Sequence, residues 1–315
     1  MSVPTSKRKK SSAQGIPASS LVRALEVVGD AWTILILKEA FQGRRRFHEF
    51  HDNLQIPRQT LMLRLAALAD NQIFFRKAVR HRTLIQEYHL TPKGLDLYNF
   101  VVSVWVWHQR WSDKQLFLPD TLYHRPCGSL LRAEFICRQC DKPVVRRDVV
   151  LMDSPERGMD PSPGPRHSRE NESAFLKGSS GRPDDLVATS IVGDRWSNLV
   201  LFSLFQGTSS YSDIKDTLGI SSNILSSRLK KLVALDLVQA EPNGRRVDYR
   251  ITPRGEDIYP MLHSLIDWAD RWLAGRKGPP QIMIHCCEAV AEARFVCASC
   301  RATLRAWDVT VARPS

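Results

Sequence analysis

Val27-Val28-Gly29-Asp30-Ala31-Trp32 recurs later in the chain as Ile191-Val192-Gly193-Asp194-Arg195-Trp196, and this repetition decides the architecture. Further motifs recur behind it in the same order and at nearly the same offset. They are Thr91-Pro92-Lys93-Gly94 with Thr252-Pro253-Arg254-Gly255, Trp107 and Trp111 with Trp268 and Trp272, and Cys127, Cys137 and Cys140 with Cys287, Cys297 and Cys300. Chance does not place several motifs in one order at one offset, so the sequence predicts an internal duplication.

A flexible linker is predicted between the two copies. Segment 153–182 is rich in Pro, Gly and Ser and holds few large apolar groups, so it cannot bury a core. The length of 315 residues also suits two domains. The predicted order is a disordered basic tail over 1–18, a winged helix-turn-helix domain over 19–115, a Cys-rich segment over 116–152, the linker over 153–182, a second winged helix-turn-helix domain over 183–275 and a second Cys-rich segment over 276–315.

The composition points to an anionic partner. A formal net charge of +12 favours nucleic acid, ahead of a membrane surface. The longest apolar runs, such as 101–107, are far shorter than the ~20 residues that span a bilayer. No secretory signal is visible at the N-terminus, so a cytoplasmic, nucleoid-associated protein is expected. In that compartment, seven cysteines suggest metal ligands or buried thiols before disulfides.

Hydrophobic periodicity in the first copy predicts a helix-turn-helix followed by a hairpin. Leu61, Leu65 and Leu68 fall on one face of a helix that a short turn separates from the helix before it. Asp30 is placed to cap a helix, and Thr91-Pro92 to begin one. The predicted elements are helices over 21–28, from Asp30 to about Gly43, over 47–54 and over 57–70, strands over 73–75 and 84–90, and one long helix from Pro92 to about Trp111. The fold class expected is mainly α with small β wings.

The candidate DNA contacts lie on the second helix of each helix-turn-helix and on each hairpin. The first residues of such a helix reach base edges in the major groove, and basic hairpin tips suit phosphates. The helix residues are Arg58, Gln59, Thr60 and Arg64 in the first copy and Ser221, Ser222, Asn223, Ser226 and Arg228 in the second. The hairpin residues are Arg76, Lys77, Arg80 and Arg82, and Arg245 and Arg246. An ordinary solvated helix face is the alternative. Because the two helices differ, an imperfectly symmetric operator is expected.

Each copy resembles the HxlR family of bacterial winged-helix transcriptional regulators. The resemblance is carried by Leu-Glu-Val-Val-Gly-Asp-x-Trp-Thr from Leu25, by Arg45-Arg46-Phe47 and by Thr-Pro-x-Gly, and it covers about 19–150 and, less closely, 183–313. It implies DNA binding by helix 57–70 and its counterpart 221–234, and pairing through the first and last helices.

Family members normally dimerise, so the resemblance implies either intrachain pairing of the two copies or a homodimer of duplicated chains. Tryptophans of the last helices would then lie at the pairing surface or in the core of each module. They are Trp105, Trp107, Trp111, Trp268 and Trp272. Some members sense oxidants through a cysteine before the first helix. Ser19 stands there, so that role is not carried over.

Each copy ends in a set of potential metal ligands. The first reads His124-x2-Cys127-x9-Cys137-x2-Cys140 and the second His285-x-Cys287-x9-Cys297-x2-Cys300. Three thiolates and one imidazole complete a tetrahedral zinc site, so one structural zinc is expected in each copy, in a zinc-ribbon-like segment. Cys286 could replace His285 as a ligand. Reduced buried thiols and a thiol switch are the alternatives.

The function these features predict is a sequence-specific, DNA-binding transcriptional regulator, and more specifically a repressor. A non-specific or architectural nucleic-acid-binding protein is the first alternative, because basic charge alone gives such binding. A zinc-dependent enzyme is the second. No paired carboxylates, nucleophile elbow or phosphate-binding loop support it, so no enzyme is predicted. The sequence reveals no effector ligand.

Overall fold

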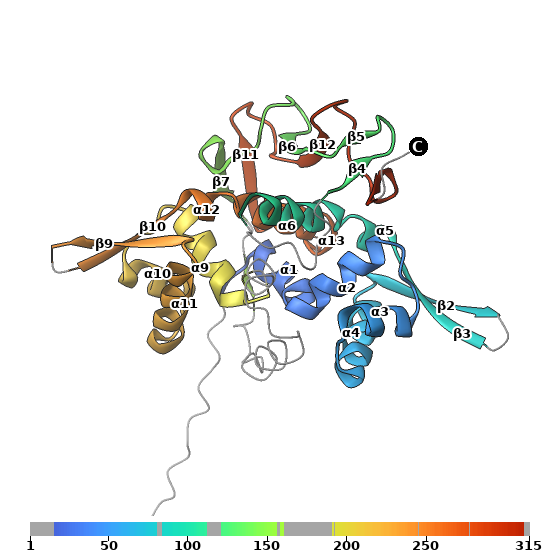
Figure 1. Cartoon of the computed structure of the whole chain (residues 1–315). Helices are drawn as coiled ribbons and strands as arrows, with labels where there is room; N and C mark the ends of the chain where they lie inside the picture. The colour runs from blue at the N-terminus through green and yellow to red at the C-terminus, as the bar shows by residue number, and fades with distance from the viewer. Residues whose placement is uncertain are drawn as a thin grey trace, which may run out of the picture.

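The computed structural model describes residues 16–80, 84–111, 121–155, 158–160, 191, 193–244, 246–276 and 278–311. Two helix-turn-helix units lie on opposite sides of a central group of helices, and the Cys-rich strands form a layer above that group (Figure 1). Among the described residues, no helix combines the length and the apolar character that crossing a membrane requires.

The first unit follows the predicted order of elements. Asp30 caps the second helix, because its carboxylate accepts a hydrogen bond from the Thr33 backbone N–H at 3.0 Å. Leu61, Leu65 and Leu68 are buried, as predicted. The elements are α1 (Ser20–Val28), α2 (Ala31–Phe41), α3 (Phe47–Leu54), α4 (Arg58–Asp70), β2 (Phe74–Arg80), β3 (Leu84–Leu90), α5 (Pro92–Leu95) and α6 (Tyr98–Trp111).

The second unit repeats this plan. Its helix-turn-helix turns on Gly219 at φ 58°, where the first unit has Gln55 at φ 51°, so both turns use a left-handed residue to end the first helix. Both second helices begin one residue later than predicted, because Pro57 and Ser221 are non-helical caps. The elements are α9 (Arg195–Phe205), α10 (Tyr211–Leu218), α11 (Ser222–Ala234), β9 (Val238–Asn243), β10 (Arg246–Ile251), α12 (Pro253–Glu256) and α13 (Tyr259–Trp272).

Two predicted elements of the first unit have different bounds. The strand expected over 73–75 is the longer β2. The long helix expected from Pro92 to Trp111 is wrong: it is two helices, α5 and α6, which break at 96–97. Gly94 packs on the carbonyl of Ile73, where an added Cβ would lie 2.3 Å from the oxygen. This close approach places the Thr-Pro-x-Gly turn against the residue just before β2.

The two units contact each other through reciprocal tryptophan hydrogen bonds. Trp107 Nε1 donates to the Arg254 carbonyl at 3.0 Å, and Trp268 Nε1 donates to the Lys93 carbonyl at 2.9 Å. Each tryptophan thus caps the α5 or α12 turn of the other unit. Trp111 and Trp272 repeat the exchange one turn later, on Asp257 and Asp96, with N–O distances of 2.6 and 2.7 Å. These four tryptophans therefore lie where the copies meet, and α1, α6 and α13 form the centre of the contact (Figure 1).

The strands of the Cys-rich segments pair between the copies. In β6 (Ala133–Cys137) and β12 (Ala293–Cys297), Phe135 lies opposite Phe295, with ring centroids 4.9 Å apart. The strand that follows in each copy pairs with the histidine-bearing strand of the other copy. These pairs are β7 (Val149–Asp153) with β11 (Gln281–His285), and β13 (Val309–Thr310) with β4 (Tyr123–His124), which also pairs with β5 (Ser129–Leu130). The two segments form one intertwined layer.

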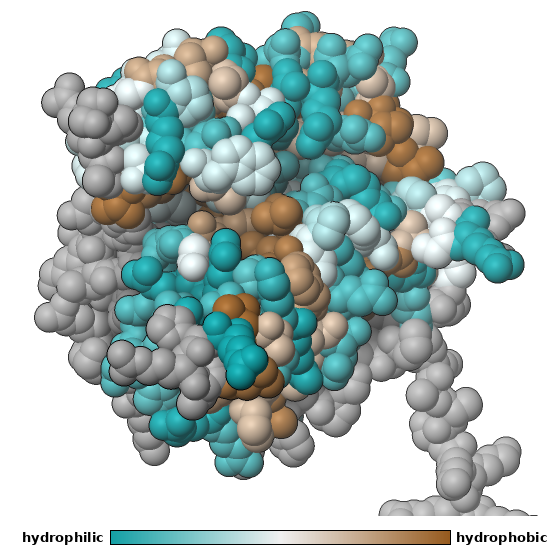
Figure 2. All heavy atoms as spheres, turned by 90° about the vertical axis from the view of Figure 1, so that its right-hand side faces the viewer, coloured by the Kyte–Doolittle hydropathy of each residue, from teal (hydrophilic) through white to brown (hydrophobic). Residues whose placement is uncertain are grey.

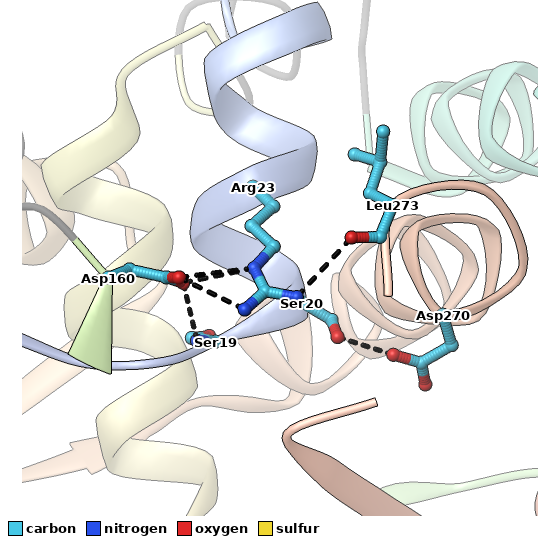
Figure 3. A network of polar contacts seen from close by, with 6 residues as sticks. All are labelled: Ser19, Ser20, Arg23, Asp160, Asp270 and Leu273. Carbon is cyan, nitrogen blue, oxygen red and sulfur yellow. Dashed lines mark hydrogen bonds and ion pairs between the residues drawn. The ribbon is translucent and has the colours of Figure 1, made fainter. Parts of the chain in front are cut away.

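A short part of the predicted linker is joined to the first helix. Strand β8 (Met159–Asp160) pairs with β1 (Ile16–Pro17), at the end of the predicted tail. The Arg23 guanidinium on α1 lies between Asp160 and α13: it forms a 3.0 Å ion pair with Asp160 and donates to the Leu273 carbonyl at 3.3 Å (Figure 3). Residues 1–15 of the predicted tail and 161–182 of the predicted linker lie outside the described residues.

Candidate nucleic-acid interface and metal centres

The second helix of the first helix-turn-helix, α4, presents Arg58 and Gln59 to solvent and keeps Thr60 half-buried. The Arg58 guanidinium lies over the Phe47 ring, 5.7 Å from its centroid. The same helix also exposes Met62 and Leu63, by 57% and 59%. Neither residue is among the DNA contacts predicted from the sequence. Two large apolar side chains beside the polar positions of this predicted DNA-binding helix are the signal that could have identified them.

Arg64 and Arg228, both predicted DNA contacts, have carboxylate partners inside the protein. Arg64 Nε lies 3.3 Å from Asp30 Oδ1, and Arg228 Nε lies 2.7 Å from Asp194 Oδ2. Each aspartate is the N-terminal cap residue of the helix before the helix-turn-helix. The two ion pairs occupy equivalent positions in the two copies. They therefore hold α4 and α11 at a fixed angle to α2 and α9.

In the second copy, α11 exposes Ser221, Ser222 and Asn223 at its start. Ser226 is half-buried, and its hydroxyl lies 3.0 Å from the Tyr211 hydroxyl, which also donates to the Ser222 carbonyl at 2.9 Å. Tyr211 on α10 therefore fixes the first turn of α11. The exposed groups at this helix start are hydroxyls and one amide, whereas α4 presents a guanidinium and an amide.

The hairpins carry exposed basic side chains and are held firmly to the helices. Arg46 Nε lies 3.1 Å from Glu87 Oε1, and this hydrogen bond lowers the pKa of the Glu87 carboxyl. Tyr88 N–H donates to the Arg45 carbonyl at 2.8 Å, and Tyr249 N–H repeats that bond on Ser209 in the second copy. The predicted hairpin contacts Arg76, Lys77, Arg80 and Arg246 are all exposed, and Arg82 and Arg245 lie outside the described residues.

Helices α4 and α11 lie on the same side of the molecule, opposite the Cys-rich layer (Figure 1). The two hairpins extend outward from the two units in opposite directions. The exposed basic and polar residues of α4 and α11 therefore lie on one side of the molecule, and those of the hairpins lie at its two ends.

The eight predicted metal ligands form two clusters, but not the two that were expected. One cluster contains His124 and Cys127 of the first copy with Cys297 and Cys300 of the second. The other contains Cys137 and Cys140 with His285 and Cys287. The prediction of one complete set in each copy is therefore wrong in its grouping. Because β6 and β12 run antiparallel, the Cys-x-x-Cys turn of each copy lies beside the histidine strand of the other.

Both clusters have dimensions that fit a tetrahedral zinc ion. The Cys127–Cys297 and Cys137–Cys287 Sγ–Sγ distances are both 3.9 Å. The histidine Nδ1 atoms lie 3.3–3.5 Å from the neighbouring thiols. A tetrahedron with Zn–S bonds of about 2.3 Å and Zn–N bonds of about 2.0 Å has edges of about 3.8 and 3.5 Å.

Within each cluster the thiol pKa values are shifted in opposite directions, because burial and the neighbouring thiols raise the pKa of Cys140 and Cys300. Hydrogen bonds from the Ser129 backbone and with His124 lower the pKa of Cys127 to about 6. Hydrogen bonds with His285 and from the Ala289 backbone lower the pKa of Cys287 to about 6. His285 Nε2 lies 3.4 Å from the Pro143 carbonyl, which leaves Nδ1 as the free donor atom facing the thiols.

Cys286, the alternative ligand, is exposed and lies outside the cluster that holds His285. The sequence could not choose between the two groupings, because each copy supplies one histidine and three cysteines, and the cysteines have the same spacing in both copies.

Comparison with known proteins identifies the helix-turn-helix units. The model of the HxlR-like helix-turn-helix family matches residues 27–116 and 191–277. An uncharacterized HTH-type transcriptional regulator of Mycobacterium tuberculosis is 37% identical over 146 residues, which cover 46% of this chain and 86% of that protein. The HTH-type transcriptional regulator YodB of Bacillus subtilis is 28% identical over 89 residues, 27% of this chain and 80% of its own. A solved structure of a protein from Pseudomonas aeruginosa is 28% identical to this chain. The match covers 44% of this chain and 94% of the solved chain, at a TM-score of 0.31.

Proposed function

This chain belongs to the HxlR-like helix-turn-helix family, and we propose that it is a repressor whose two repeats bind one DNA site together as an intrachain pseudo-dimer. DNA binding and transcriptional regulation follow from the family and from its HTH-type regulator relatives. Repression, the pairing of the copies on one operator and the residues that read it are our proposal. Repression is the simplest outcome of a compact protein that occupies promoter DNA.

The observation that carries the proposal is the reciprocal contact between the units. Trp107 and Trp268 each donate to the turn that begins the last helices of the other unit. Such an exchange fixes the distance and angle between α4 and α11. Since a helix-turn-helix pair reads half-sites about one helical turn apart, a fixed separation is what an operator reader needs.

The two halves of the operator are expected to differ. On α4, we assign Arg58 to guanine, Gln59 to adenine, and exposed Met62 to a thymine methyl group. On α11, Asn223 would read adenine, and the serines would bind a base or a phosphate. The hairpins act as wings whose basic residues bind the backbone. Arg64 and Arg228 position the recognition helices rather than contact DNA.

The two cysteine clusters are proposed to hold one zinc ion each. The ligands would be His124, Cys127, Cys297 and Cys300 in one site and Cys137, Cys140, His285 and Cys287 in the other. Zinc would be structural, because four protein ligands leave no position open for substrate. Each site takes two ligands from each copy, so metal binding would join the copies above the helices in addition to the tryptophan contacts.

Selection of DNA from a random library, followed by footprinting, tests the function. We expect one site of two unlike half-sites, spaced by about one helical turn. Gln59→Ala should relax the sequence preference in one half-site, and Asn223→Ala in the other. Arg132→Gln, an exposed change in the Cys-rich layer, is the control.

A salt titration separates regulation from non-specific binding, the competing function that the net charge of +12 favours. Specific regulators bind their site about 10³-fold or more tightly than random DNA at physiological salt. Equal affinities for selected and random DNA, falling together with salt, would contradict the proposal and support an architectural role.

A further inference from the structure

A cavity of about 840 Å³ lies between the two repeats on the side of the first helix-turn-helix unit. One wall is the end of α2, the base of the β2–β3 hairpin and the outer face of α6. The rest of the lining is Leu122, Arg125 and Leu131 of the first repeat together with segment 306–311 of the second. This volume is within the range of small-molecule sites. Figure 2 shows this side of the molecule, with hydrophobic surface in the hollow between the hydrophilic upper and lower parts.

The cavity is lined by aromatic side chains. Phe41 and Tyr98 contact each other with ring centroids 5.1 Å apart, and Trp105 lies beside them. Trp307 of the second repeat lines the mouth and is 62% exposed. Rings arranged in this way suit a planar apolar group of a ligand.

The polar groups of the cavity are donors and cations. Among the described residues, its lining contains Lys38, Arg44, Arg45 and Arg125 and no aspartate or glutamate. Lys38 and Arg44 form ion pairs with Glu39 behind the wall. Within the described part of the chain, the Arg45 and Arg125 guanidinium groups have no hydrogen bond or ion pair. Burial and the charge of Asp308 raise the pKa of Tyr98, so its hydroxyl stays a donor. A carboxylate is the group that these donors complement.

The equivalent place in the other half of the molecule is partly filled. There a smaller cavity of about 400 Å³ is lined by Phe205 and Tyr259, which correspond to Phe41 and Tyr98. The Arg146 side chain enters it and donates to the Phe205 carbonyl. The residue equivalent to Arg146 in the larger cavity is Ala306, which is too short to do so. The duplication therefore supplies an internal comparison: an arginine side chain narrows one copy of the pocket, and no such side chain enters the other.

We propose that the open cavity binds a small aromatic carboxylate, and that this ligand regulates DNA binding. The second part rests on the proposed function. The lining includes Gln42, Arg45 and Tyr88, which flank the Arg46–Glu87 pair that joins the hairpin to the helices. A ligand that spans from these residues to segment 306–311 ties the first DNA-reading unit to the second repeat. If the ligand binds more tightly at one angle between the first helix-turn-helix unit and the second repeat, its binding must change the affinity for DNA.

Isothermal titration calorimetry on the full chain, with 2-naphthoate as the probe, tests the site. We expect one molecule bound per chain, and binding about tenfold or more weaker for the neutral analogue 2-naphthalenemethanol, which cannot form a charge-assisted hydrogen bond. Ala306→Arg, which copies the arginine of the other pocket, should abolish binding. Arg125→Gln should weaken it about tenfold, whereas the control Arg132→Gln should not. If Ala306→Arg fails to fold, Arg125→Gln carries the test.

Equal binding of the neutral analogue, or unchanged binding by both pocket variants, would overturn the site. A DNA-affinity measurement with and without 2-naphthoate then separates the two proposals. A shift of about threefold or more in the wild type, absent in Ala306→Arg, supports regulation. Ligand binding with no shift overturns the regulatory part alone. Failure to bind any specific DNA, with calorimetric binding intact, overturns the proposed function and leaves the site standing.

Discussion

The zinc content of two double cysteine variants tests whether each metal site takes ligands from both repeats. Cys127→Ser with Cys297→Ser changes two residues of the same cluster, although they come from different copies. Cys127→Ser with Cys137→Ser changes two residues of the same copy, but one in each cluster. The two double variants remove the same number of thiols and differ only in this grouping.

The structure gives the size of the effect. The intact chain has two sets of four ligands, so we expect about two zinc ions per chain. The first double variant leaves the set of Cys137, Cys140, His285 and Cys287 complete and should keep about one zinc. The second double variant leaves three ligands in each set and should keep about none after dialysis against a chelator of moderate affinity.

Elemental analysis of the dialysed proteins, with a colorimetric assay of metal released by a thiol reagent, measures these counts. Cys286→Ser is the control, because Cys286 is exposed and outside both clusters, and it should keep about two zinc ions. If the same-copy double variant keeps one zinc and the cross-copy variant none, the shared sites are refuted in favour of one site per copy. Zinc-free wild-type protein would refute both arrangements of the metal sites.

Three further predictions concern the packing of the repeats. Gly94→Ala places a Cβ 2.3 Å from a backbone carbonyl oxygen and should lower the free energy of unfolding by about 1–3 kcal/mol in denaturant melts, whereas Gly158→Ala, with open space around it, should change it little. Trp107→Phe removes the donor to the Arg254 carbonyl at a buried position and should lower the free energy of unfolding by about 1–3 kcal/mol, more than the same change at half-exposed Trp272; equal losses would contradict this. Burial raises the pKa of Asp270 to about 7, above its unfolded value, so stability should fall as pH rises from about 4 through 7. Asp270→Asn should remove that fall and be the more stable protein at pH 8, and identical pH profiles of the two proteins would contradict the reasoning.

The sequence predicted what depends on local patterns. Asp30 and Thr91 cap helices as their positions predicted, because capping needs only a short polar side chain next to an apolar helix. The duplication was visible because both copies keep the same motifs in the same order. The buried face of α4 was predicted from the spacing of Leu61, Leu65 and Leu68.

What the sequence did not predict depends on contacts between distant residues. The exchange of cysteine pairs is set by pairing of Phe135 with Phe295, and the spacing within one copy carries no information about it. The close approach of Gly94 to the Ile73 carbonyl likewise joins residues that are distant in the sequence. The ion pair between Arg64 and Asp30 did have a signal in the sequence. The same two residue types recur at the equivalent positions of the second copy, as Arg228 and Asp194.

The composition of the complex on the selected DNA site tests the central claim most directly. Sedimentation equilibrium of the full chain with a duplex carrying both half-sites gives the number of chains per duplex. We expect one chain of 35.8 kDa per duplex, with both half-sites protected in a footprint of the same complex. Two chains per duplex, or one chain that protects a single half-site, would contradict the claim that the two repeats of one molecule read the operator together.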